Sequence, residues 1–130
     1  MITESIIQLL VQNQQLALRV GDRIEPNVIK PDSFFPAVYV SSYRMQKMPC
    51  DNGNGVMTGT IEIGVYSTSY AEAAEIMYLI RTTLDDFSGF INGVGISILN
   101  GEQTADDYDE EGARNIQVIE YEAFAQISST

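Results

Sequence analysis

Histidine and tryptophan are absent from this chain of 130 residues, and cysteine occurs once, as Cys50. Without histidine, neither a Ser–His–Asp nor a Cys–His mechanism can be assembled, so the usual base that would make Cys50 a nucleophile is missing. One thiol and no imidazole cannot fill the tetrahedral ligand set of zinc. A lone cysteine forms no internal disulfide, and we interpret Cys50 as a free thiol in a turn-rich loop.

Long apolar runs and basic residues are also scarce. No run is long enough for a transmembrane helix, and the N-terminus lacks the pattern of a signal peptide. We therefore expect no membrane partner and a cytosolic place of synthesis. Seven Lys and Arg face eighteen Asp and Glu, for a net charge of −11. Because the basic residues are scattered, we expect the chain to repel nucleic acid rather than to bind it.

The remaining composition suits one folded domain, which we assign to residues 1–130. Hydrophobic residues make up 45% of the chain, an ordinary fraction for a soluble protein. This length can bury one core without help from disulfides or metals. Neither an internal repeat nor a linker divides the sequence.

Helical periodicity predicts two helices, over residues 3–18 and 69–87. Gly21 is a plausible cap at the end of the first helix. In the second, Ser69 is the expected N-cap and Glu72 completes a capping box. Ser88 and Gly89 are expected to end it.

Alternation of apolar and polar residues predicts four strands, each with one covered face. They span residues 36–47, 56–67, 93–100 and 113–127, and a short strand is expected within 23–29. The element order is then α-β-β-β-α-β-β. This order predicts an α+β fold in which a mainly antiparallel sheet of four to five strands has two helices packed on one face.

An acidic stretch, residues 100–112, separates the last two predicted strands and is expected to be a polar connection. It could be a calcium loop, a solvated hairpin tip, or a charged surface that a partner reads or that repels DNA. A calcium loop beginning at Asp107 has Val118 at position twelve, where a bidentate Glu is required. One beginning at Asp51 has glycines at its third and fifth positions. We therefore predict no metal site.

Other patterns that carry chemistry are weak. The neighbouring carboxylates Asp85–Asp86 and Asp106–Asp107 could do acid–base work, but nothing places two of them across a cleft. The glycine clusters at 53–55 and 93–95 lack the spacing of a phosphate-binding loop. We predict no catalytic residue and no cofactor. Four tyrosines in predicted strands fit either an interface or half-buried sheet positions: Tyr39, Tyr43, Tyr66 and Tyr121.

Three stretches have a distinctive order and spacing: Val20–Pro26 after the first helix, Phe35–Val40 entering a strand, and Ile61–Ala73 across a strand-to-helix turn. Together they resemble the tail completion, or tail terminator, proteins of long-tailed bacteriophages. The first is similar to a family segment VGDRIYP, and the third to a passage that ends in YAEA. The likeness covers nearly all of residues 1–127.

The resemblance implies a structural role without catalysis. Proteins of this family form a ring, usually a hexamer, on the head-proximal end of the tail tube, where the ring stops tube growth and presents a surface for joining the head. The implied partners are other copies of the chain, the tail tube protein and a head-completion or neck protein. DNA passes through the lumen without specific binding. The implied location is the host cytoplasm during assembly and then the virion.

The acid excess fits such a channel. Six copies would carry a charge of about −66, and carboxylates on the wall would discourage DNA from sticking. We expect one acidic group near the lumen or an axial interface: Asp106, Asp107, Asp109, Glu110 and Glu111. A second candidate is a loop, longer and richer in Gly and Asn than the family pattern, that we expect to contact the tube or the next subunit: Cys50, Asp51, Asn52, Gly53, Asn54 and Gly55.

Two other functions stay open at this point. Another ring-forming neck protein, such as a head-completion or tail-to-head adaptor, would share the small size, the mixed fold and the symmetry. A small acidic enzyme or ligand-binding domain belongs to a different class. It would require a deep pocket that holds two carboxylates with raised pKa.

Overall fold

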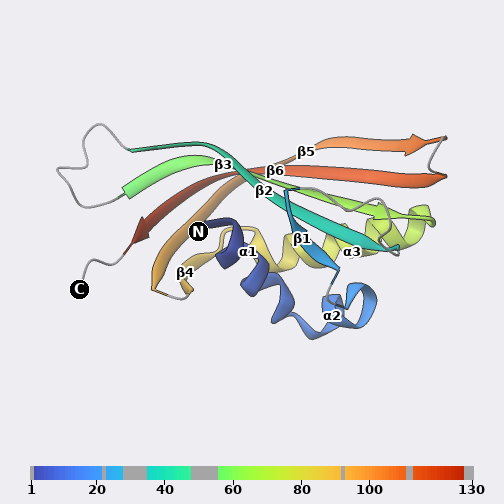
Figure 1. The fold of residues 1–130 in the computed structure, drawn as a ribbon, viewed down its shortest axis with the longest axis horizontal. Coiled ribbons are helices and arrows are strands. Elements are labelled where there is room, and N and C mark those ends of the chain that lie inside the picture. Colours follow the sequence, from blue (N-terminus) through green and yellow to red (C-terminus); the bar gives the residue numbers. More distant parts are fainter. Residues whose placement is uncertain are drawn as a thin grey trace.

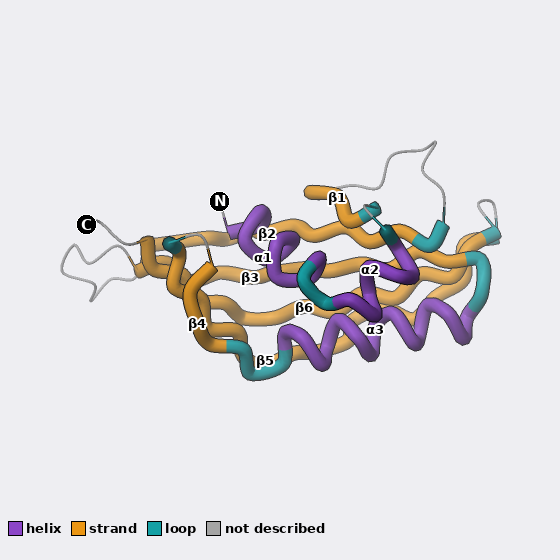
Figure 2. Tube along the Cα trace, turned by 90° about the horizontal axis from the view of Figure 1, so that it is seen from below, coloured by secondary structure: helices purple, strands orange, loops and turns teal. Residues whose placement is uncertain are grey.

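A computed structural model describes residues 2–21, 23–27, 35–47, 56–91, 93–110 and 113–127. In this part of the chain a curled sheet of six strands has three helices on one side (Figure 1; Figure 2). The helices are α1 (Ile2–Val11), α2 (Gln14–Val20) and α3 (Tyr70–Leu84). The strands are β1 (Ile24–Pro26), β2 (Ala37–Lys47), β3 (Val56–Ser67), β4 (Ser88–Ile91), β5 (Val94–Asp109) and β6 (Arg114–Ile127).

The strand order across the sheet is β1-β2-β3-β6-β5-β4. Every neighbouring pair is antiparallel except β1 with β2, which is parallel. The two outer strands are short. In the described chain, β1 pairs with Val38–Val40 of β2, and β4 pairs with Val94–Ser97 of β5. Beyond these contacts, the outer edges of β2 and β5 pair with no other strand of the described chain.

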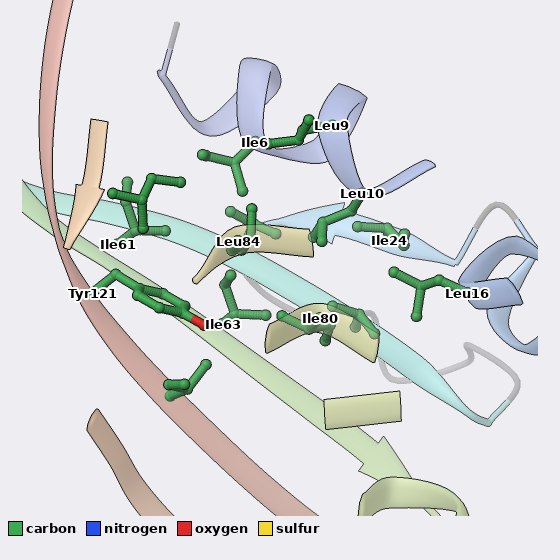
Figure 3. Close-up of a cluster of buried hydrophobic side chains, with 14 of the residues drawn as sticks. Ile6, Leu9, Leu10, Leu16, Ile24, Ile61, Ile63, Ile80, Leu84 and Tyr121 are labelled. Carbon is green, nitrogen blue, oxygen red and sulfur yellow. The ribbon is translucent and has the colours of Figure 1, made fainter. Parts of the chain in front are cut away.

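The hydrophobic core lies between the helices and the sheet face that they cover (Figure 3). Alternate residues of the two central strands point into it, so that the predicted period of two is realised. Fully buried side chains of the core include Ile6, Leu10, Leu16, Ile61, Ile63, Ile76, Ile80, Leu84, Ile119 and Tyr121. These strands and helices therefore hold each other in place by burying one contiguous apolar layer.

The mixed α+β fold with helices on one sheet face is confirmed, but the predicted helix count was wrong. The predicted helix over 3–18 is two helices, because Asn13 interrupts it. The Asn13 side chain accepts hydrogen bonds from the backbone amides of Gln15 and Leu16, so it caps the start of α2. Its amide group donates to Thr83 of α3 at 2.8 Å, which fixes the break against the neighbouring helix.

The predicted strand count and several boundaries were also wrong. Helix α3 ends at Leu84, and the expected helix stop at Ser88 and Gly89 lies in the additional strand β4. The acidic stretch expected to be a connection is mostly strand, since β5 continues to Asp109 in pairing with β6. Two expected caps are confirmed: Gly21 follows α2 with a positive φ of 59°, and the Ser69 hydroxyl accepts from the amide of Glu72 at 3.3 Å. The predicted capping box is incomplete, because the Ser69 amide donates to the Ser67 hydroxyl and Glu72 accepts from that hydroxyl at 2.7 Å.

Candidate functional site

The sheet face opposite the helices carries a pattern of its own, and we call it the helix-free face. Its residues alternate with the core residues of the same strands, because successive side chains of a strand point to opposite sides. They include Tyr39, Ser41, Tyr43, Thr60, Glu62, Gly64, Tyr66, Leu99, Glu102, Asp107, Arg114, Ile116, Val118, Glu120, Glu122 and Phe124.

A row of carboxylates crosses the middle of the helix-free face. The strand register places Glu62 opposite Glu120 and Glu120 opposite Glu102. Glu122 lies two residues further along β6, opposite Leu99. Like charges directly opposite each other destabilise a sheet. The fold therefore tolerates a local cost at this row, as expected of a surface used for something other than stability.

Two tyrosine hydroxyls are directed at this row from β2. The Tyr39 hydroxyl donates a hydrogen bond to a Glu62 carboxylate oxygen at 3.0 Å. Burial, and then the hydrogen bond to Glu62, raise the pKa of Tyr39 well above its ordinary value. Partial burial and the Glu120 carboxylate likewise raise the pKa of Tyr43. Both hydroxyls therefore stay protonated and act as donors that soften the repulsion among the carboxylates.

Beside the carboxylate row, aromatic rings gather around one cation. The rings of Tyr39 and Tyr66 meet edge to face with centroids 6.0 Å apart, and Phe35 meets Tyr66 at 6.4 Å. The Arg114 guanidinium lies 4.6 Å from the Tyr66 ring centroid and 5.9 Å from that of Phe35. Such cation–π contacts hold a positive charge over an apolar surface. Tyr39 belongs to both groups and joins them.

The described acids of the group predicted to line a lumen lie along the far half of β5 and at the turn after it, and they divide between the two faces of the sheet. Asp106 accepts a hydrogen bond from the Tyr70 hydroxyl of α3 at 3.0 Å. Asp107 is exposed and lies opposite Ile116, on the helix-free face. Asp109 ends β5 opposite Arg114, and Glu110 is exposed. Glu111 lies outside the described residues. The structure thus spreads the four described acids along the far end of the β5–β6 hairpin. The candidate partner-contact loop Cys50–Gly55 also lies outside the described residues.

A groove of about 530 Å³ runs between α3 and the far half of β5. Its lining includes Tyr78, Arg81, Asp85 and Asp106. The hydroxyl of buried Tyr121 donates to Asp85 at 2.6 Å, and burial followed by this hydrogen bond raises the pKa of Tyr121 above its ordinary value. Both acids thus accept hydrogen bonds from tyrosines, as parts of the packing between α3 and the hairpin.

Metal-ligating side chains do not converge in the described part of the chain, where no group of three or more Asp, Glu or Cys is arranged to hold an ion. In the same part of the chain, no helix is long and apolar enough to cross a membrane.

Sequence reasoning missed the carboxylate row because its members are separated in the chain. Each glutamate alternates with core residues in its own strand, and that parity was visible in the sequence: Glu62 stands between Ile61 and Ile63. The parity alone did not show that β3 lies next to β6, or that Glu102 belongs to a strand at all. Only the register brings the row together.

Comparison with known proteins gives one family and a shared fold. The sequence profile of the family described as "Tail completion protein gp17" matches residues 4–126. A solved chain from the virion of a native gene transfer agent particle is 17% identical, with a TM-score of 0.66, and the alignment covers 95% of this chain and 93% of that one. A second solved chain is 13% identical with a TM-score of 0.54, and both chains are covered completely. No curated protein sequence matches.

Proposed function

The chain belongs to the tail completion protein gp17 family, and from this membership we propose that it forms a ring on the head-proximal end of a phage tail tube. There the ring stops tube growth and joins the tail to the head. The family match over residues 4–126 is the observation that carries the proposal, and it supports a structural role in tail assembly. The fold shared with a virion chain agrees with that role.

The helix-free face is the surface that we assign to the lumen of the ring. Its carboxylate row combines with a net charge of −11 to give a wall that repels a phosphate backbone. The helices on the other face would then lie on the outside of the ring. DNA would slide past Glu62, Glu102, Glu120 and Glu122 without binding them.

The acids at the end of the β5–β6 hairpin are proposed to face an axial interface or the rim of the lumen: Asp106, Asp107, Asp109, Glu110 and Glu111. The loop Cys50–Gly55 is proposed to contact the tube or the next subunit. Deletion of Asp51–Gly55 should then weaken capping while the urea midpoint of the domain stays unchanged. Normal capping by the deleted protein would count against this role.

Binding of purified protein to isolated tail tubes, viewed by negative-stain electron microscopy, tests the proposal. Caps at one end of each tube, with tube length fixed when the protein is added, are the expected result. Attachment to DNA-filled heads without tube binding would replace the proposal with a neck adaptor. Binding to neither would overturn both assembly roles.

The lumen assignment has its own test. Replacing Glu62, Glu120 and Glu122 together by Lys should leave caps visible but retain DNA in the channel, so that ejection into solution slows. A matched control replaces three exposed acids outside the helix-free face by Lys: Glu4, Glu75 and Asp86. Equal ejection rates for the two variants would exclude the helix-free face from the lumen.

A further inference from the structure

We propose that neighbouring copies of this chain join edge to edge, the outer edge of β2 in one copy pairing antiparallel with the outer edge of β5 in the next. The inference rests on the proposed ring and names the surface that closes it. We assign a second copy to each edge for three reasons: both edges have unpaired backbone groups, their open segments are offset in a way that lets them meet, and their charges are opposite.

The backbone argument begins with two unpaired edges. Past β1, the outer edge of β2 is open from Ser41 to Lys47, and past β4, the outer edge of β5 is open from Leu99 to Asp109. Both stretches expose rows of amides and carbonyls that pair with no strand of the described chain. An edge of this length is a template for strand addition.

The short strands β1 and β4 cover part of the outer edges of β2 and β5, and they do so at opposite ends of the sheet. The register runs from Ser41 through Glu62 and Glu120 to Glu102, so these four residues stand at one level of the sheet. From that level the open part of β2 extends one way and the open part of β5 the other way. For the two open segments to meet, the next copy must be shifted along the strand direction. The β4 strand of the first copy then lies end to end with β2 of the next copy, and β1 of the next copy lies end to end with β5 of the first.

This shift has the size that a closed barrel requires. A shift of about five residues, or ~17 Å, per four full strands, or ~19 Å of sheet, corresponds to a strand tilt of ~40°. Strands in closed barrels tilt by about 35–45°. Six copies of four strands at this tilt would close with a backbone radius of ~25 Å, which leaves room for a nucleic-acid duplex.

The strand directions fit as well. Within one copy β2 and β5 run in opposite directions, because each of the pairs β2–β3, β3–β6 and β6–β5 is antiparallel. In a ring every copy keeps the same orientation about the axis, so β2 of the next copy arrives antiparallel to β5. The contact joins two different surfaces and repeats head to tail, which is the kind that closes into a ring.

The charges of the two edges are opposite. Arg44 projects from the bulge in β2 with a positive φ of 57°, and its guanidinium contacts only the Tyr43 ring, 5.6 Å away, within the described chain. The open part of β5 carries exposed Glu102, Asp106 and Asp107. With the shift above, Arg44 of one copy faces the segment between Glu102 and Asp106 of the next. Complementary charges select this pairing over contact between two β5 edges.

Charge reversal tests the contact, with caps on tail tubes as the readout. Arg44→Glu alone and the double variant Glu102→Lys/Asp107→Lys alone should each lower the capped fraction by about tenfold or more, since each puts like charges face to face. An equal mixture of the two variants should recover capping, because in an alternating ring every contact again joins opposite charges. Failure of the mixture to recover would overturn the head-to-tail pairing.

Two controls carry the same changes in charge on the helices. Arg19→Glu matches Arg44→Glu, and Glu4→Lys/Glu75→Lys matches the double variant on β5. Both should cap as the wild-type protein does, and circular dichroism should show that all variants are folded. Normal capping by Arg44→Glu would overturn the edge pairing and leave the proposed ring standing. Absence of caps from the wild-type protein would instead overturn the proposed function.

A cross-link gives a readout that does not depend on charge. In a Cys50→Ser background, Arg44→Cys and Gln103→Cys in the same chain should form disulfides between copies on tubes, giving a ladder up to the full ring on a non-reducing gel. The pair Leu18→Cys and Gln103→Cys, with one cysteine on α2, is the matched control and should give no ladder. A ladder from the control alone would place the contact on the helices.

Discussion

The two faces of this sheet are built by the same strands and behave in opposite ways. The helix-covered face is apolar, buried and closed by α1, α2 and α3. The helix-free face carries like charges opposite one another, tyrosines that donate to them and an arginine over aromatic rings. The difference teaches that one half of each strand's residues specifies the fold, and leaves the other half available for function. Changes matched across the faces test this division.

Leucine truncation should separate the faces most strongly. Leu84 of α3 is 0% exposed and Leu99 of the helix-free face is 39% exposed. Leu84→Ala should lower the free energy of unfolding by about 2–5 kcal/mol, since it leaves a cavity, whereas Leu99→Ala should cost less than about 1 kcal/mol. Urea unfolding of both variants measures the pair. Equal costs would show that the helix-free face is part of the core.

Two glycines beneath tyrosine rings give the next contrast. A Cβ at Gly101 would meet the ring of Tyr121, which is buried, and a Cβ at Gly64 would meet the ring of Tyr39, which is half-buried. Gly101→Ala should cost about 1–3 kcal/mol, because the buried ring has nowhere to move. Gly64→Ala should cost less, since Tyr39 can turn toward solvent. Thermal or urea unfolding decides, and a larger cost at Gly64 would contradict the contrast.

The same two tyrosines differ in what their hydroxyls stabilise. Tyr121→Phe removes the hydrogen bond to Asp85, at an expected cost of about 1 kcal/mol of stability. Tyr39→Phe removes the bond to Glu62 and should cost less in the wild-type protein, because Tyr39 is more exposed. In a Glu62→Gln background the effect of Tyr39→Phe should shrink further. A double-mutant cycle measures the coupling energy between the Tyr39 hydroxyl and the Glu62 carboxylate. A coupling energy of zero would show that the hydroxyl does not stabilise the carboxylate row.

Alkaline pH should erase the advantage of Tyr121 over Phe. The pKa of Tyr121 is raised in the folded protein above its ordinary value of 10.0. A raised pKa gives a stabilising contribution that is complete below pH 10 and is lost as the pH rises toward the folded value. The stability gap between the wild-type protein and Tyr121→Phe should therefore narrow above pH 10. A stability difference that grows above pH 10 would mean that folding lowers the pKa of Tyr121 instead of raising it.

The smallest effect should be a gain of stability. Glu120→Gln removes one charge from a row in which Glu62 and Glu102 flank it. The free energy of unfolding should rise by about 0.2–1 kcal/mol at low salt and by less at high salt. Urea titrations at two salt concentrations measure the change. A loss of stability at low salt would mean that Glu120 is stabilised by its neighbours rather than repelled.

The elements with one buried face could be predicted, because burial of one face places apolar residues at a regular spacing along a helix or a strand. Helix α3, with Ser69 as its cap, and strands β3 and β6 follow patterns that their own residues display. The break at Asn13 was missed because Gln14 and Gln15 are compatible with one continuous helix, and only the contact with Thr83 reveals the cap. The periodicity of residues 3–18 carries no information about Thr83, which is seventy residues away in the chain.

The long strand β5 was missed for a different physical reason. Its far half is polar on both faces, and a strand with no buried side has no alternation to detect. Pairing with β6 creates it, with bulges after Leu99 and Gln103. The carboxylate row was lost with it, since Glu102 was assigned to a connection. The site therefore depended on long-range pairing, which the sequence encodes only through both partners at once.

The pairing of β3 with β6 also governs how the chain must fold. Val56 lies beside Gln126, so the middle of the sheet closes across the whole segment that contains α3, β4 and β5. The hairpin of β5 and β6 is local and can form early, whereas the β3–β6 seam brings together distant parts of the chain. High contact order of this kind slows folding to the millisecond-to-second range typical of β-rich domains. Nascent chains would thus expose unpaired strands for longest at the seam, which makes the folding step itself the period of greatest exposure to aggregation.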